Sequence, residues 1–124
     1  MKTIYHRYET GLKNCSSIHL IPTDIYRGEL PLYVEVLCKN RNNLMTFLKN
    51  KNIQCKLFYP NLNRAAYFDC SSTFVNANKF ESQGLTLPCG PDQSIDNIDR
   101  VIDAILSYEN QSCEYTKQFS VAEA

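Results

Sequence analysis

The sequence has no excess charge of either sign. Its 13 lysine and arginine residues balance its 13 aspartate and glutamate residues, so the formal net charge at pH 7 is zero. A protein without a net field does not attract polyanions over long distances. We therefore expect neither nucleic acid nor an anionic membrane surface to be its partner.

Long apolar runs are also lacking. No stretch approaches the roughly 20 apolar residues of a membrane-spanning helix. The beginning of the chain, MKTIYHRYETGLKNC, alternates charged with apolar residues and does not form the apolar centre of a signal peptide. From these two absences we expect a soluble, cytoplasmic protein.

The cysteines and histidines lack the spacings of disulfide or metal sites. The six cysteines include no Cys-x-x-Cys pair, and His6 and His19 have no suitable Cys or carboxylate neighbours. Because a cytoplasmic protein keeps its thiols reduced, we interpret the cysteines as free thiols, mostly in the core. No metal site is expected.

Sequence motifs of common catalytic sites are missing as well. There is no GxGxxG, P-loop or GxSxG sequence. Asp96, Asp99 and Asp103 recur at the spacing of one helical face, which is more typical of a solvated stripe than of an acid/base pair. The sequence therefore predicts no catalytic residue in this chain.

The 124 residues suit one domain, which we place at residues 1–110, followed by a flexible tail at 111–124. Alternating apolar residues predict strands in LYVEVLC (32–38) and IQCKLFY (53–59), and a brief third strand in LTLPCGP (85–91). IHLIPTD (18–24) is expected to be a short extended piece interrupted by Pro22.

Helical spacing predicts four helices. One lies near the start of the chain, one follows a cap at Asn40, one lies in TFVNANKFESQG (73–84) and stops at a left-handed Gly84, and one follows a cap at Ser94. The predicted fold class is α/β (α+β), a small three-stranded sheet flanked by helices. The third strand either inserts between the first two or simply lies next to them, and we prefer insertion.

A cluster of aromatic, amide and guanidinium side chains follows the second strand. The stretch from Phe58 to Arg64, FYPNLNR, lies after a strand end with Tyr67 close behind, on an irregular loop where side chains can converge on a ligand. Aromatic rings can stack on a base or a sugar, and Arg can pair with a pyrophosphate. Alternatively, the aromatic residues are core residues and the amides form turns.

Five segments of this chain, in this order, carry a resemblance to a known family. They are YHRYETGLKN, LYVEVLCKNRNNLMTFLKNKNIQCKLFYP, AAYF, ANKFESQGLTLPCG and SIDNIDRVIDAI. Together they resemble the C-terminal small domain of the DegT/DnrJ/StrS family, the pyridoxal-phosphate-dependent sugar-nucleotide aminotransferases, and perosamine-synthase-type members in particular. The resemblance covers nearly all of residues 3–108.

Individual motifs of the family can be placed on this chain. The Arg-x-x-Leu helix start matches Arg41 to Leu44, and the later Gly-x-x-Leu-Pro-Ser-Gly matches the segment from Gly84 to Gly90, with Cys89 at the Ser position. The family's substrate-side His falls on Leu62, and its later Pro falls on Ala65.

The resemblance implies a set of substrate-binding residues. The family loop lines a sugar-nucleotide site, so Phe58, Tyr59, Asn63 and Arg64 are expected to bind substrate. Asn63 is included because a one-residue slip would place its amide where the family has the imidazole.

The resemblance also implies that part of the chemistry lies elsewhere. In the family the Schiff-base Lys, the Asp that pairs with the pyridine nitrogen and the phosphate-binding residues belong to a preceding large domain. We therefore expect no cofactor bound by this chain alone, and pyridoxal phosphate if a large domain completes it.

Such a complete enzyme would move an amino group from glutamate to a keto-sugar nucleotide in polysaccharide biosynthesis. The expected partners are a large-domain chain or a second copy of this chain, together with a sugar nucleotide. The alternatives are a non-enzymatic remnant or interaction module of the same fold, or an unrelated ligand-binding domain.

Overall fold

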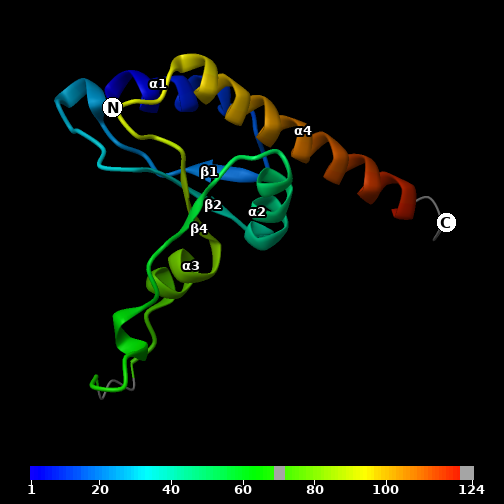
Figure 1. Cartoon of the computed structure of the whole chain (residues 1–124). Helices are drawn as coiled ribbons and strands as arrows, with labels where there is room; N and C mark the ends of the chain where they lie inside the picture. Colours follow the sequence, from blue (N-terminus) through cyan, green and yellow to red (C-terminus); the bar gives the residue numbers. More distant parts are fainter. Residues whose placement is uncertain (69–71, 121–124) are drawn as a thin grey trace.

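A four-stranded antiparallel sheet organises the chain in the computed structural model, which describes residues 1–68 and 72–120, with side chains up to residue 114 (Figure 1). The strands are β1 (Ile18–Leu20), β2 (Val34–Cys38), β3 (Lys56–Leu57) and β4 (Gly84–Leu87). The helices are α1 (Lys2–Gly11), α2 (Arg41–Asn50), α3 (Val75–Gln83) and α4 (Ile95–Ser120), with short 3-10 turns η1 (Ile25–Arg27) and η2 (Leu62–Arg64). The predicted mixed α/β class is confirmed.

The strand order β1-β2-β4-β3 confirms the preferred insertion of the last strand. Because β4 is antiparallel to both β2 and β3, those two strands run parallel to each other on either side of it. The predicted count of three strands was too low, since Ile18–Leu20 pairs with Val36–Cys38 of β2. This strand is only three residues long and is followed by Pro22, which cannot donate to a ladder, so the sequence pattern is weak there.

One face of the sheet carries the main core. Val34 lies opposite Leu87 and Val36 lies opposite Leu85, and all four side chains are buried. Helices α1, α2 and α4 cover this face with the buried side chains Ile4, Tyr5, Tyr8, Leu44, Leu48, Ile98, Val101, Ile102 and Ile105. The amphipathic stripes of these helices thus meet on one sheet face, as their periodicity predicts.

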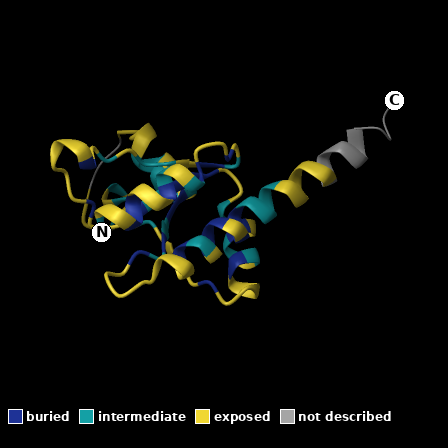
Figure 2. Ribbon diagram, turned by 90° about the horizontal axis from the view of Figure 1, so that it is seen from above, coloured by how far each residue is buried: buried dark blue, intermediate teal, exposed yellow. Residues whose placement is uncertain are grey.

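Helix α4 begins at the predicted cap, where the backbone N–H of Asn97 donates to Ser94 Oγ at 3.2 Å. The helix is longer than expected: it continues beyond Gln111 to Ser120 and extends away from the body of the domain, with residues 111–114 exposed (Figure 2). Flexibility of the tail stays a prediction, and residues 121–124 lie outside the described residues.

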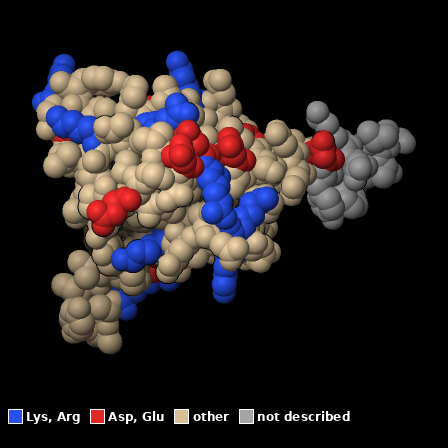
Figure 3. Space-filling model, turned by 45° about the horizontal axis from the view of Figure 1, so that its top comes forward, with Lys and Arg blue, Asp and Glu red and all other residues tan. Residues whose placement is uncertain are grey.

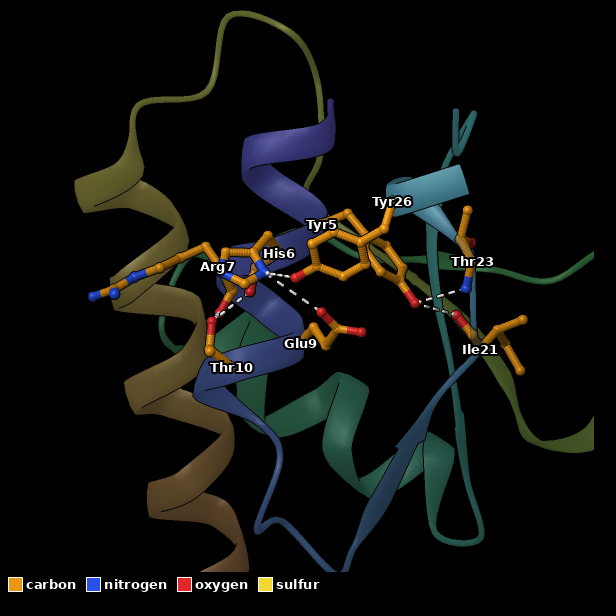
Figure 4. A network of polar contacts seen from close by, with 8 residues as sticks. All are labelled: Tyr5, His6, Arg7, Glu9, Thr10, Ile21, Thr23 and Tyr26. Carbon is orange, nitrogen blue, oxygen red and sulfur yellow. Dashed lines mark hydrogen bonds and ion pairs between the residues drawn. The ribbon is translucent and has the colours of Figure 1, made fainter. Parts of the chain in front are cut away.

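Side chains of α1 contact the loop between β1 and β2 (Figure 4). Tyr5 donates to the carbonyl of Ile21 at 3.1 Å and accepts from the N–H of Thr23 at 2.8 Å. Farther along the same loop, the Tyr26 hydroxyl lies 3.1 Å from His6 Nδ1. These contacts fix the loop that leads into β2.

The Glu109 carboxylate ties α4 to the turn that follows α1. One oxygen accepts from the Ser16 N–H at 2.5 Å, the Ser17 N–H at 3.1 Å and the Ser16 hydroxyl. Burial raises the pKa of Glu109, but the hydrogen bonds from Ser16, Cys15 and Ser17 outweigh burial and lower it overall.

Charged groups are otherwise distributed over the surface. Figure 3 shows basic and acidic side chains mixed on the visible face. Within residues 1–68 and 72–120, no helix is both long enough and apolar enough to cross a membrane.

Gly84 corrects a detail of the predicted fold. Its backbone is extended, with φ −72° and ψ 134°, so it is not the expected left-handed stop. Helix α3 passes directly into β4 at this residue, without a loop. A Cβ atom on Gly84 would lie 2.6 Å from Phe58 Cβ and even closer to the carbonyl oxygen of Phe80. Glycine is needed here for space and not for a positive φ.

Gly84→Ala is expected to lower the free energy of unfolding by about 1–3 kcal/mol, because the backbone carbonyl of Phe80 must move to admit the methyl group. Gly90→Ala is the matched control, since its Cβ would meet nothing within 4 Å. Urea unfolding of both variants measures the difference. Equal stability of the two would contradict the close approach at Gly84.

Glu109→Gln is expected to destabilise the domain at neutral pH and to lose this effect in acid. Because the folded-state pKa is lowered, the carboxylate stabilises the fold fully above the ordinary glutamate pKa of 4.5, and this stabilisation is lost as the pH falls through the folded-state pKa. Thermal unfolding from about pH 3 to 7 should therefore show wild type and variant converging in acid. Glu114→Gln, on an exposed position of the same helix, should show no such gap.

Candidate functional site

The predicted site residues lie on a projection of the domain, which we call the arm and define as residues 58–68. It follows β3, contains η2 and extends away from the sheet beyond α3 (Figure 1). Pro60 prevents β3 from continuing, because proline cannot donate to the ladder and fixes its own φ. The opening of the arm is therefore determined locally by the sequence.

The base of the arm is fixed by Phe58. Its backbone N–H donates to the carbonyl of Gly84 at 3.2 Å, and its half-buried ring packs on Phe80 of α3 with the ring centroids 5.2 Å apart. On its other side the ring meets Tyr59 edge-on, at 6.1 Å between centroids. Phe58 thus borders Tyr59 on one side, while Tyr59 itself is 65% exposed.

The next part of the arm is fastened to α3 by two side-chain bridges. Asn61 Nδ2 donates to Asn78 Oδ1 at 2.6 Å, and Arg64 Nε lies 3.2 Å from Glu81 Oε2. Asn61 and Arg64 are three residues apart on the arm, and their partners Asn78 and Glu81 are three residues apart on α3. One side of the η2 segment therefore lies along one side of α3. Arg64 is therefore ion-paired within the domain, although 67% of its side chain is exposed.

Asn63 lies between these two bridges and is half-buried. Its amide has no hydrogen-bond partner among the described residues. Neither a hydrogen bond nor a ring contact between described residues joins Asn63 or Arg64 to Phe58 or Tyr59. The structure therefore brings the predicted residues onto one arm, but in two separate pairs.

Apolar side chains on and beside the arm are exposed to an unusual degree. Leu62, at the position of the family's His, is 72% exposed. Leu57, Tyr67, Phe68, Phe74 and Val75 are also exposed large hydrophobic residues. Exposed large apolar side chains that gather on one projection mark a candidate surface for another molecule to cover.

Arg41 supports the arm from behind. Its guanidinium donates to the carbonyl of Glu81 and, at 3.4 Å, to that of Gly84. These carbonyls belong to the end of α3 and the start of β4, where backbone acceptors lack helical partners. The Arg-x-x-Leu match therefore has a structural explanation. Arg41 stabilises the α3–β4 junction that Phe58 contacts through the Gly84 carbonyl, and Leu44 is in the core.

The second face of the sheet is only partly covered by helices. Helix α3 covers the end near Leu37, whereas Glu35, Thr86 and Lys56 form a row across β2, β4 and β3 that points away from the main core. Partial burial raises the pKa of Glu35. A hollow of about 530 Å³ borders this row at Lys56 and Thr86 and includes Tyr33.

The described residues of the arm offer exposed aromatic rings, an amide and a guanidinium, which are groups suited to binding. Every lysine whose side chain is described is exposed, so none lies in a buried pocket that could hold pyridoxal phosphate as a Schiff base. No cluster of three or more potential metal ligands occurs among the described residues. Of the six cysteines, the five that the structure describes are free thiols, and Cys70 lies outside the described residues.

Sequence reasoning missed the α3 residues that shape the arm. Phe80, Asn78 and Glu81 contact the arm directly, but the sequence pattern places them only within a predicted helix. A usable signal was present: Asn78 and Glu81 are three apart, as are Asn61 and Arg64. That complementarity becomes meaningful only once α3 is known to lie beside η2.

Comparison with known proteins gives a consistent result. The model of the DegT/DnrJ/EryC1/StrS aminotransferase family matches residues 1–106. A search of curated proteins found no match.

Several solved structures share the fold. A DegT/DnrJ/EryC1/StrS aminotransferase from Brucella abortus has 20% identity and a TM-score of 0.70 over 87% of this chain and 30% of its own. PseC of Helicobacter pylori, an aminotransferase involved in the biosynthesis of pseudoaminic acid, has 10% identity and a TM-score of 0.75, covering 89% and 32%. DesI, solved in the presence of its TDP-sugar product, has 19% identity and a TM-score of 0.76, covering 96% and 33%. The chain thus spans about a third of the length of these proteins.

Arg64→Ala is expected to lower the free energy of unfolding by less than about 1 kcal/mol, because an exposed ion pair contributes little. Arg41→Ala is the comparison, since it leaves backbone carbonyls at the α3–β4 junction without their donor and should cost about 1–3 kcal/mol. Urea unfolding measures both. A loss at Arg64 as large as that at Arg41 would make Arg64 a structural residue instead of a candidate ligand-binding residue.

Proposed function

Because the chain belongs to the DegT/DnrJ/EryC1/StrS aminotransferase family, we propose that it is the C-terminal small domain of a pyridoxal-phosphate-dependent sugar-nucleotide aminotransferase. The completed enzyme would transfer an amino group from glutamate to a keto-sugar nucleotide, in the cytoplasm and in polysaccharide biosynthesis. The family match over residues 1–106 supports this assignment, as does the fold shared with PseC and with DesI, which was solved with its TDP-sugar product.

In this proposal the chemistry is divided between two parts. Pyridoxal phosphate would supply the amino-group transfer, held by a lysine of a large domain, because the described lysines of this chain are all exposed. The present chain would bind and orient the sugar nucleotide and close the site on one side. On its own it would not transaminate.

The observation that carries the proposal is the geometry of the arm's base. Tyr59 is exposed, and its ring meets the ring of Phe58 edge-on; Phe58 in turn packs on Phe80 and donates through its N–H to the Gly84 carbonyl. An exposed aromatic ring beside a packed one is suited to stack on a sugar or a base.

The two remaining residues would act through polar contacts. The Asn63 amide has no partner among described residues and is free to hydrogen-bond a sugar hydroxyl. Arg64 would pair with the pyrophosphate, in place of or in addition to Glu81. We assign binding roles to all four residues and proton transfer to none.

A partner is part of the proposal. The apolar surface of the arm, with Leu62 and Tyr67 among its exposed residues, would be covered by a large-domain chain or by a second copy of this chain. The second candidate function is an interaction module that has kept this surface and lost the chemistry. The exposed Leu62 at the family's His position favours it.

Isolation of the tagged chain from its own host distinguishes the two candidates. Intact mass spectrometry identifies co-purifying chains, and an absorbance scan detects bound pyridoxal phosphate. A larger co-purifying chain that carries the cofactor supports the aminotransferase. A colourless protein, alone or self-associated, supports the interaction module.

In the completed enzyme, Tyr59→Ala is expected to weaken sugar-nucleotide binding about tenfold, because a stacked aromatic ring contributes roughly this much. Isothermal titration calorimetry with the enzyme's sugar nucleotide measures the change. Tyr26→Ala is the matched control: this tyrosine is 76% exposed but lies on η1, away from the arm, and its substitution should leave binding unchanged. Unchanged affinity in Tyr59→Ala would remove the arm from the substrate site.

A further inference from the structure

A second candidate binding site lies where β1 begins and β2 ends. It is a hollow of about 310 Å³ formed by four separate parts of the chain: β1 with the turn before it, the end of β2 with the turn after it, helix α3 and the middle of α4. The arm contributes no residue to it. The hollow is therefore distinct from the surface discussed above.

Basic side chains from three elements surround this hollow. His19 comes from β1, Lys39 from the turn before α2, and Lys79 from α3. Its lining contains no Asp or Glu. Since the chain as a whole has equal numbers of acidic and basic residues, this is a local excess of positive charge.

Another surface hollow of the domain has a mixed lining. The hollow beside Arg7 is also lined by Asp99 and Asp103, and Arg7 forms a bidentate ion pair with Asp99. In the hollow where β1 begins and β2 ends, which we call the β1 hollow, the lining residues Ser16 and Ser17 contact the carboxylate of Glu109, whose bonded oxygen accepts from both of them. The lysines of the β1 hollow have no such partner.

The serines of the hollow are hydrogen-bonded within the fold, but five of its other polar side chains are not. His19, Lys39 and Lys79, together with the amides of Asn40 and Gln83, make no hydrogen bond or ion pair with described residues. Asn40 also precedes α2 without capping it through its side chain, which leaves the first N–H groups of that helix without a side-chain acceptor. Five unpaired donor groups thus surround one small space.

We propose that this hollow binds a phosphate group of a small molecule. A phosphate offers several acceptor oxygens and negative charge, which suits lysines converging from different elements and amide donors between them. The small volume accommodates a phosphate with a few further atoms and is too small for a duplex nucleic acid. The inference does not depend on the proposed aminotransferase function.

The test is a titration of the full chain with inorganic phosphate, followed by ¹H–¹⁵N NMR. We expect saturable shifts at the amides of Ser17, Lys39, Asn40 and Lys79, and none in sodium chloride of equal ionic strength. A parallel titration with pyrophosphate shows whether the hollow prefers a free phosphate or a phosphate that is joined to a further group. Linear shifts that are the same in chloride would overturn the proposal.

Paired variants identify the residues involved. The double variant Lys39→Gln/Lys79→Gln should weaken phosphate binding by at least about tenfold, because it removes two charge-assisted contacts. Lys13→Gln/Lys49→Gln removes the same charge outside the hollow and should leave the affinity unchanged. Equal effects of the two double variants would show only a general charge effect and would contradict the site.

A nearly isosteric change provides an independent check. Gln83→Glu introduces a carboxylate into the hollow without altering its size, and it should abolish phosphate binding by repulsion. The variant's dispersed NMR spectrum verifies the fold in the same experiment. Undiminished phosphate binding in this folded variant would place the bound anion elsewhere.

Discussion

The structure depends on one close approach, at the junction of α3 and β4. Gly84 ends a helix and begins the central strand in a single residue, and there is no room for a Cβ between Phe80 and Phe58. Because β4 lies between β2 and β3, the position of this junction determines where both neighbouring strands pair. Arg41 reinforces it by donating to the carbonyls of Glu81 and Gly84.

The arm inherits its position from that junction. Phe58 donates its N–H to the Gly84 carbonyl and packs on Phe80, so the first residue of the arm contacts both the sheet and α3. The contacts become more exposed farther out, where Arg64 and Glu81 meet as an ion pair. A rigid base with an adaptable outer part is suited to present Tyr59 to a ligand while the outer part adjusts to a partner.

The two candidate sites differ in the kind of molecule they suit. The arm combines exposed rings with a mostly apolar surface, which requires a covering partner before it forms an enclosed site. The β1 hollow is small, basic and already bordered by four elements of the folded chain. An incomplete site for a sugar nucleotide and a formed site for phosphate can therefore exist on one domain without sharing residues.

Much of the local structure followed from the sequence. Several features depend on neighbours within a few residues, so their physical causes are visible in the order of the amino acids. They are the alternation in β2, the Ser94 cap, the apolar stripe of α4 and the end of β3 before Pro60. Family motifs likewise identified the arm and its four candidate residues before their geometry was known.

Other features required the folded chain because their causes are contacts between distant segments. The three-residue strand β1 exists only because β2 offers it a partner. The extended backbone of Gly84 follows from the approach of Phe58, 26 positions earlier, and the ion pair of Arg64 follows from the placement of α3. The sequence by itself determined the elements and the family, through short-range periodicity and ordered motifs. Only the tertiary structure decided which side chains remain free to bind, because hydrogen bonds and burial between remote residues consume some of them and leave others exposed.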